Sequence, residues 1–389
     1  MGGGETRAAP HLFVLHAPNV CPVDMIHDSV MDYYSRKLAT ASSDRTIKVW
    51  DVHGETYNHA ATLTGHDGCV PVPPLFAPRP RLCRRARALS LSLSLSLFVI
   101  CLPVGLSLCL CRYCCVPPDS LPPSPSHPLV FHGSPVWQVA WAHPKFGVLL
   151  ASCSFDGKVI IHRESQPGVW SPIHEQAWHK SSVNSVAWAP HEYGLILGCA
   201  SADGYVSILK HMPDDSWEMT PLEDGKLGCN SISWAPVTSI VSNLMPNNGL
   251  PPMKFVTGSC DNNVRLWEQR PDGSWPTEAK KLPAKHEDWV RDVAWGPNSS
   301  GPSSIVASCS EDRRVIIWTQ SDPAGEWEAK DLCEKFAAPV WRVSWSVTGN
   351  LLAVSCGDHT VTLWKQSLSG DWTKVSDVTD DGAQEEKAN

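Results

Sequence analysis

The sequence predicts an all-β fold, a six-bladed β-propeller open on one side, and three observations carry this prediction. Successive units share a period of 46 to 58 residues, typical of propeller repeats of the WD type. Apolar residues alternate with polar ones over short runs separated by turn residues, which indicates strands joined by hairpins. Each unit also has an Asp six residues before the end of a β-branched run: Asp44, Asp156, Asp203, Asp261, Asp312 and Asp358.

Each unit is predicted to contain four strands. The first ends near a Trp, as in Val136–Trp141, and the second is small and apolar, as in the run from Leu149 to Cys153. The Asp lies in the turn that follows, and a β-branched third strand comes next. The fourth strand is expected to begin at another Trp: Trp170, Trp217, Trp275, Trp327 and Trp372.

The repeated Asp has a structural task in such a turn, because its carboxylate accepts hydrogen bonds from the backbone of its own turn. In WD repeats the Asp also orients a His from the loop before the first strand, and the candidates are His66, His179 and His286. A pair that recurs once per blade favours a structural role over a catalytic one. In the second and third units, His162 and Leu209 replace the Trp that ends the third strand, so these blades are expected to pack less regularly.

Residues 69–134 interrupt the repeat. Without these 66 residues the step from Asp44 to Asp156 falls from 112 to 46, which equals the last step. The segment has no Trp, Lys or Glu, yet it holds 12 of the 33 prolines and 7 of the 15 cysteines. It is a low-complexity insert in the loop between blades one and two, where insertions are tolerated. We expect it to be largely disordered.

Leu and Ser alternate from Leu89 to Leu97, as an alternating CT tract would read when translated. Our hypothesis is that residues 69–134 are translated non-coding sequence, such as a retained intron. Two alternatives stay open. Residues 88–111 carry no charge and are long enough for a transmembrane helix. The cysteines at 109, 111, 114 and 115 suggest metal binding, although no second ligand pair lies at a suitable spacing.

Without the insert about 320 residues remain, enough for one propeller domain, which we place at 24–68 and 135–378. Residues 1–23 are expected to be poorly ordered and 379–389 to form a disordered tail. The cysteines outside the insert lie mostly in second strands and imply no disulfide framework, which favours the cytosol. The formal net charge of −8 argues against direct binding of nucleic acid. No phosphate loop, nucleophile elbow or metal-binding helix is found. We therefore expect no enzyme, cofactor or metal.

Both terminal units contain four strands within their own stretch, apart from a possible spare strand at 12–15. Neither end therefore supplies a strand to a blade shared with the other end. Such a ring closes through side-chain contacts alone or stays open, and an exposed strand edge invites strand addition from another protein.

Four stretches extend the argument from the fold to a family: 24–45, 135–144, 181–191 and 288–295. The first begins Asp24-Met25-Ile26-His27-Asp28, and the second begins Pro135-Val136-Trp137. The amino-acid sequence of these stretches resembles that of the small WD-repeat subunit of the COPII outer coat, the Sec-thirteen family. The resemblance covers about residues 24–68 and 135–378 in order, but neither the first two dozen residues nor the insert.

This resemblance implies a non-enzymatic scaffold that is cytoplasmic and peripheral on the endoplasmic reticulum membrane and COPII vesicles. Its implied partner is the large α-solenoid subunit of the coat, which inserts a seventh blade. A solenoid nucleoporin of the Y-shaped complex is the implied partner at the nuclear pore. Membrane association would be indirect, through the coat. The implied partner-facing edge is the first strand of blade one, residues Asp24, Met25, Ile26, His27 and Asp28.

Two rival functions remain. A related WD-repeat nucleoporin has the same fold, but the amino-acid sequence of the repeats favours the coat subunit. A ubiquitin-ligase substrate receptor carries an Arg two residues after a Trp-Asp pair. Here the pair Trp50-Asp51 is followed by Val52 and His53, so the required Arg is missing.

Overall fold

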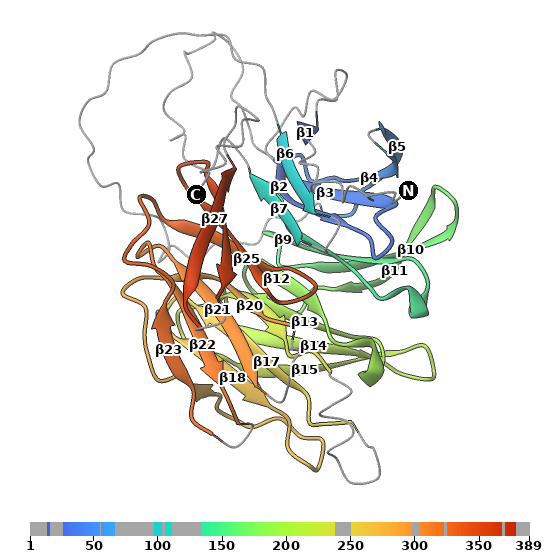
Figure 1. Cartoon of the computed structure of the whole chain (residues 1–389). Coiled ribbons are helices and arrows are strands. Elements are labelled where there is room, and N and C mark those ends of the chain that lie inside the picture. Colours follow the sequence, from blue (N-terminus) through green and yellow to red (C-terminus); the bar gives the residue numbers. More distant parts are fainter. Residues whose placement is uncertain are drawn as a thin grey trace, which may run out of the picture.

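The computed structural model of the chain describes residues 14–15, 26–54, 56–66, 97–102, 106–110, 134–237, 250–297, 303–322, 325–367 and 370–378. Six four-stranded sheets form the blades (Figure 1). Each blade consists of four strands consecutive in the sequence, ordered from the inner to the outer edge. The predicted six-bladed propeller is confirmed.

The first three blades follow one another along the chain. Blade one contains β2 (Ile26–Met31), β3 (Lys37–Ser42), β4 (Ile47–His53) and β5 (Thr56–Leu63). Blade two contains β8 (Val136–Trp141), β9 (Leu149–Ser154), β10 (Val159–Gln166) and β11 (Val169–Gln176). Blade three contains β12 (Val183–Trp188), β13 (Ile196–Ser201), β14 (Tyr205–His211) and β15 (Trp217–Glu223).

The last three blades complete the propeller. Blade four contains β16 (Cys229–Trp234), β17 (Lys254–Ser259), β18 (Val264–Glu268) and β19 (Lys280–Lys281). Blade five contains β20 (Val290–Trp295), β21 (Ser304–Ser310), β22 (Val315–Gln320) and β23 (Glu328–Asp331). Blade six contains β24 (Val340–Trp345), β25 (Leu351–Cys356), β26 (Val361–Gln366) and β27 (Trp372–Val378).

Buried side chains between neighbouring blades form the core. The second strands are the most buried, and all six residues of both β9 and β13 are buried. One cluster joins Ala151 and Cys153 of blade two to Val183 and Val186 of blade three. Since each sheet buries its faces against its neighbours, a single blade has no complete core of its own.

The predicted start of the fourth strand is wrong in blade four. Trp275 is the expected first residue of this strand, but β19 is a two-residue strand at Lys280–Lys281. Pro276 follows Trp275 and has no N–H to donate to a sheet. The Trp275 ring instead packs on Phe255, with 5.1 Å between the ring centroids. Trp275 thus contributes to the core from a loop.

A seventh, smaller sheet contains two strands of the insert. β6 (Leu97–Leu102) pairs with β7 (Leu106–Leu110) on one side and with β1 (Val14–Leu15) on the other. The possible spare strand at 12–15 is thus found at Val14–Leu15, paired with the insert and not with a terminal blade. The sequence predicts a disordered insert, and the structure adds these two strands to it.

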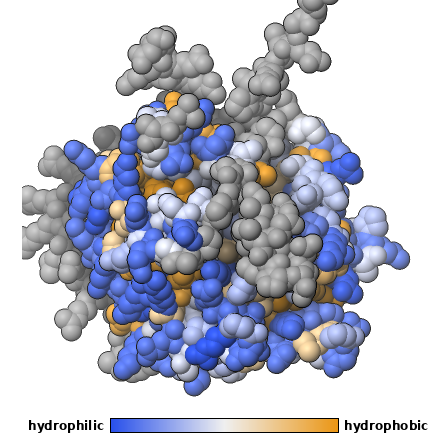
Figure 2. Space-filling model, turned by 60° about the horizontal axis from the view of Figure 1, so that its bottom comes forward, coloured by the Kyte–Doolittle hydropathy of each residue, from blue (hydrophilic) through white to orange (hydrophobic). Residues whose placement is uncertain are grey.

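The small sheet lies between the first and last blades, and its strand β7 packs against β2, β24 and β25 (Figure 1). Where the structure describes residues 88–111, at 97–102 and 106–110, they form strands and not the alternative transmembrane helix. No helix within the described ranges is long and apolar enough to span a membrane. The face shown in Figure 2 is mainly hydrophilic, and its hydrophobic residues lie in small separate groups. The expectations for residues 1–13, 16–23 and 379–389 fall outside the described residues.

Candidate functional site

The six repeated Asp residues all lie in the turn between the second and third strands of a blade. In every turn one carboxylate oxygen accepts a hydrogen bond from the backbone N–H two residues later, over 2.8 to 3.2 Å. The donors are the N–H groups of Thr46, Lys158, Tyr205, Asn263, Arg314 and Thr360. This is the geometry of an Asx-turn, and it fixes the backbone of the turn between the second and third strands.

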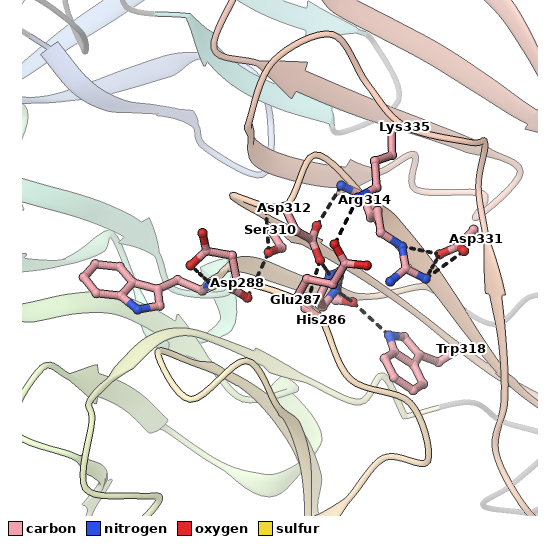
Figure 3. Close-up of polar contacts among 11 residues, drawn as sticks. His286, Glu287, Asp288, Ser310, Asp312, Arg314, Trp318, Asp331 and Lys335 are labelled. Atoms are coloured by element: carbon pink, nitrogen blue, oxygen red, sulfur yellow. Dashed lines mark hydrogen bonds and ion pairs between the residues drawn. The ribbon is translucent and has the colours of Figure 1, made fainter. Parts of the chain in front are cut away.

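In blade five the Asp belongs to a buried network (Figure 3). Nδ1 of His286 lies 3.0 Å from a carboxylate oxygen of Asp312, and Nε2 of His286 lies 2.8 Å from the hydroxyl of Ser308. Trp318 donates from Nε1 to the same hydroxyl over 2.9 Å. Burial raises the pKa of Asp312, but His286 and two backbone N–H groups outweigh burial and lower this pKa to about 2. The carboxylate is therefore ionised at neutral pH.

The other two His candidates occupy equivalent positions. Nδ1 of His179 lies 3.1 Å from Asp203, and its Nε2 lies 2.8 Å from Ser207. Nδ1 of His66 lies 3.3 Å from Asp156, although 90 positions separate the two residues in the sequence. His66 precedes the insert and Asp156 follows it, so blades one and two keep their usual contact across the insert.

Blade four has an arrangement that the sequence reasoning missed. Asp224 takes the place of the His, and it accepts hydrogen bonds from Thr257 over 2.5 Å and from Trp267 Nε1 over 3.1 Å. Arg265 bridges Asp224 and the repeat residue Asp261. Burial raises the pKa of Asp261, but the hydrogen bonds and charge of Arg265 outweigh this effect and the pKa is lowered. The sequence does contain a sign of this arrangement, because only this unit of the six has an Arg four residues after its repeated Asp.

Blades two and three lack the Trp that ends the third strand elsewhere. Leu209 is fully buried in its place, and His162 is 3% exposed. Nδ1 of His162 has no hydrogen-bond partner. Burial, aided by the nearby His66, lowers the pKa of His162 to about 4, so this His is neutral at pH 7.

None of these networks forms a reactive centre. The His and Asp side chains are directed into turns and strand ends, and each pair belongs to a different blade junction. Within the described ranges, no group of three or more His, Cys, Asp or Glu residues could hold a metal ion. The chemistry of the paired residues is that of fixed hydrogen bonds.

Polar side chains link each inner strand to the next around most of the ring. Each first strand has a β-bulge near its start, and in five of the six the residue just after the bulge accepts a hydrogen bond from an N–H of the following blade. The acceptors are Asp28, Gln138, Ser185, Ser231 and Asp292, and the donors are the N–H groups of Val139, Val186, Ile232, Val293 and Val343. We call these five contacts the acceptor latches.

A second set of links runs in the opposite direction. A Trp at the end of the first strand donates from Nε1 to a carbonyl of the preceding blade over 2.9 to 3.0 Å. The donors are Trp141, Trp188, Trp234 and Trp345, and the acceptors are the carbonyls of Val30, Ala140, Ala187 and Ala294. We call these four contacts the tryptophan latches.

The seam between blades six and one has the side chains for neither latch. Arg342 occupies the acceptor position of blade six, and a guanidinium can only donate hydrogen bonds. Met31 occupies the Trp position of blade one, and its side chain has no donor. The seam has instead an ion pair between Arg342 and Asp28 at 3.7 Å. Burial raises the pKa of Asp28, while Arg342 acts in the opposite direction.

The expected partner edge, the start of β2, lies at this seam, but two of its side chains contact blade two. Ile26, His27 and Asp28 begin β2, whereas Asp24 and Met25 lie outside the described residues. His27 contacts the Trp137 ring of blade two edge to face at 4.5 Å and bonds to Ser43. Asp28 accepts a hydrogen bond from blade two. Both polar side chains are thus used within the propeller, which leaves backbone and apolar groups for a partner.

Comparisons with known proteins agree with this architecture. The family model "WD domain, G-beta repeat" matches residues 24–51, 124–163, 170–209, 226–268, 279–319 and 332–365. Protein transport protein SEC13 homolog A of Arabidopsis thaliana is 42% identical over 357 residues, covering 91% of this chain and 96% of the relative. Protein SEC13 homolog of Dictyostelium discoideum is 41% identical, covering 91% and 95%.

A fungal relative extends this similarity. Protein transport protein sec13 of Emericella nidulans is 39% identical over 366 residues, covering 91% of this chain and 95% of the relative. The six matched repeats correspond to the six blades, and the relatives are covered almost from end to end. The chain is therefore a WD-repeat propeller of the Sec13 family, a family of non-enzymatic scaffolds.

Proposed function

We propose that this chain is the scaffold propeller of the COPII outer coat. In this role it pairs with the large α-solenoid subunit to build the cage for transport from the endoplasmic reticulum to the Golgi. The seam between blades six and one carries the proposal. There Arg342 and Met31 replace the latching residues. The two blades at this junction therefore lack the latch hydrogen bonds that a sheet from another protein would have to break elsewhere in the ring. The names of the relatives, which are protein transport proteins, support the same role.

The seam between blades six and one also suggests how the partner would bind. Each propeller blade packs its faces against two neighbours, and a sheet supplied by the solenoid would take the place of the small sheet between blades one and six. Affinity would come from apolar packing and backbone contacts, since His27 and Asp28 are already engaged within the propeller. Localisation would be cytoplasmic and peripheral on the endoplasmic reticulum membrane, through the coat.

The same seam would serve a solenoid nucleoporin, with the propeller at the nuclear pore as part of the Y-shaped complex. We include this second role because one type of blade insertion satisfies both assemblies. Competition between the two solenoids for a limiting amount of this chain tests it. If both bind at once, they do not share the seam.

A variant that closes the seam tests the proposal. Met31→Trp with Arg342→Gln gives the seam the residue types of both latches. Co-purification with the coat solenoid subunit should then fall sharply, because the incoming blade must displace a closed junction. Trp188→Phe is the matched control, since it removes a latch between blades two and three and leaves the seam unchanged. Undiminished binding by a folded closed-seam variant would show that the solenoid binds elsewhere.

A further inference from the structure

The small sheet β7-β6-β1 is arranged like a blade. β6 and β7 are consecutive antiparallel strands of the insert, and β1, which precedes blade one in the chain, pairs with the other edge of β6. β7 lies against β2 and β24, which are the inner strands of blades one and six. In Figure 1 the two cyan strands β6 and β7 lie between the blue strands of blade one and the red strands of blade six. The sheet therefore occupies the seam with its innermost strand toward the axis.

The seam accepts such a sheet because of its own composition. The five other junctions bring inner strands directly together, β2 with β8, β8 with β12, β12 with β16, β16 with β20 and β20 with β24. Acceptor latches close all five of these junctions. At the sixth junction Arg342 can only donate and Met31 has no donor, so the ion pair of Arg342 with Asp28 stands in place of the two latches. The sequence of the two inserted strands, from Leu97 to Leu110, is free of charged residues, as a sheet between two blades requires.

We infer that strands β1, β6 and β7 form a seventh blade in cis, which occupies the seam and competes with a partner's sheet for it. This inference rests on the proposed function in one respect, the identity of the competitor. The cis blade has three strands, one of them two residues long, whereas every other blade has four. A smaller sheet buries less surface than a complete blade, so a four-stranded competitor can displace it.

Self-occupancy lowers the apparent affinity for a partner by the fraction of molecules with an open seam. If the cis blade fills the seam in about nine molecules of ten, the partner binds about tenfold more weakly than to an unoccupied propeller. The insert would then set a threshold of partner concentration for assembly.

Two proline substitutions in β7, Ser107→Pro and Cys109→Pro, test the inference in the full-length chain. Proline removes N–H groups from the pairing of β7 with β6, in which Ser107 faces Cys101 and Cys109 faces Val99. The matched control places the same substitution at Ser120 and Ser126, in a proline-rich stretch of the insert. A third protein lacks residues 69–134.

The first measurement needs no partner. Hydrogen exchange followed by mass spectrometry should show faster exchange in β2 and β24 when β7 is broken or deleted, and no change in the Ser120/Ser126 control. Equal exchange in all four proteins would overturn the inference, because the seam would then be unoccupied.

The second measurement is the affinity for the purified coat solenoid subunit. It should rise about tenfold for the β7 variant and the deletion, but not for the control. Changed exchange with unchanged affinity would overturn the competition. If no variant binds the solenoid while β2 and β24 still differ in exchange, the proposed function fails and the cis blade remains.

Discussion

At the scale of single residues, the buried His–Asp networks set the geometry of the turns. Replacing His286 by Ala leaves Asp312 buried without its largest hydrogen-bonding partner and removes the bond to Ser308. We expect a loss of about 1–3 kcal/mol in the free energy of unfolding, because a buried charged acceptor loses its donor. Denaturant titration measures the change.

Asp358 provides the control for this substitution. It has the same Asx-turn bond but is exposed, so Asp358→Ala should cost about 0.5 kcal/mol or less. Equal losses for the two variants would mean that the His contributes nothing beyond the turn.

His162 predicts an acid sensitivity. Its pKa is 6.5 when exposed and about 4 in the folded chain, so between these values the unfolded state binds a proton that the folded state does not. Stability is therefore full above about pH 6.5 and falls as the pH drops toward 4, by at most about 3 kcal/mol. His162→Leu, which introduces the residue that blade three has at Leu209, should flatten the unfolding profile over this range.

The exposed His53 is the matched control, and His53→Leu should leave the same pH profile unchanged. His27 has a pKa lowered to about 4 by burial and by Arg342, so part of the slope will persist in the His162 variant. If the free energy of unfolding of His162→Leu falls with pH as steeply as that of the unsubstituted chain, His162 does not contribute to the acid sensitivity.

At the scale of strands and blades, the latches determine how firmly neighbouring sheets join. Trp188→Phe keeps an aromatic ring but removes the Nε1 donor to the carbonyl of Ala140. We expect a loss of about 1 kcal/mol, the net value of one hydrogen bond, measured as a shift in the midpoint of thermal unfolding. Trp178→Phe is the control, because Trp178 is 38% exposed and forms none of the latches.

Much of the blade architecture could be predicted from the sequence, because strand alternation and turn residues repeat along it. The positions of the Asp turns and His partners also follow from local spacing. Blade four escaped prediction, since Asp224 and Arg265 replace the usual residues with a pair of opposite charge. Trp275 was misplaced because the proline after it ends the repeat pattern early.

The latches could not be foreseen for a different reason. They depend on contacts between residues about 45 to 110 positions apart, such as Val186 with Gln138 and Val139 with Asp28. A single sequence shows such pairs only once the blades are superimposed residue by residue. Arg342 then stands out against five residues that can accept a hydrogen bond, and Met31 stands out against five Trp residues.

At the scale of the whole molecule, the origin of the insert decides which form of the chain is made. The hypothesis of translated non-coding sequence predicts transcripts that join the codons flanking residues 69–134 directly. Sequencing the message across this junction checks it. An abundant, uninterrupted message that encodes the segment would contradict the hypothesis and strengthen the case for the cis blade.

Deletion of residues 69–134 should leave the propeller folded, because His66 and Asp156 already meet across the insert. We expect higher solubility, since the uncharged, Leu-rich stretch 88–111 is removed with the insert. The amount of protein in the supernatant after expression, compared with the full chain, measures this. Reduced solubility of the deletion variant would mean that the insert protects the seam from association.

The self-contained blades have one more consequence. Because no sheet among the six described blades combines strands from the two ends, the chain admits circular permutation: new ends opened in the loop between blades three and four would still yield six whole sheets. The weak junction would not move with the ends, since blades six and one would still meet there with Arg342 and Met31 at the latch positions. In this propeller the position of the weak junction depends on the residues at the latch positions, and the order of the blades along the chain does not change it.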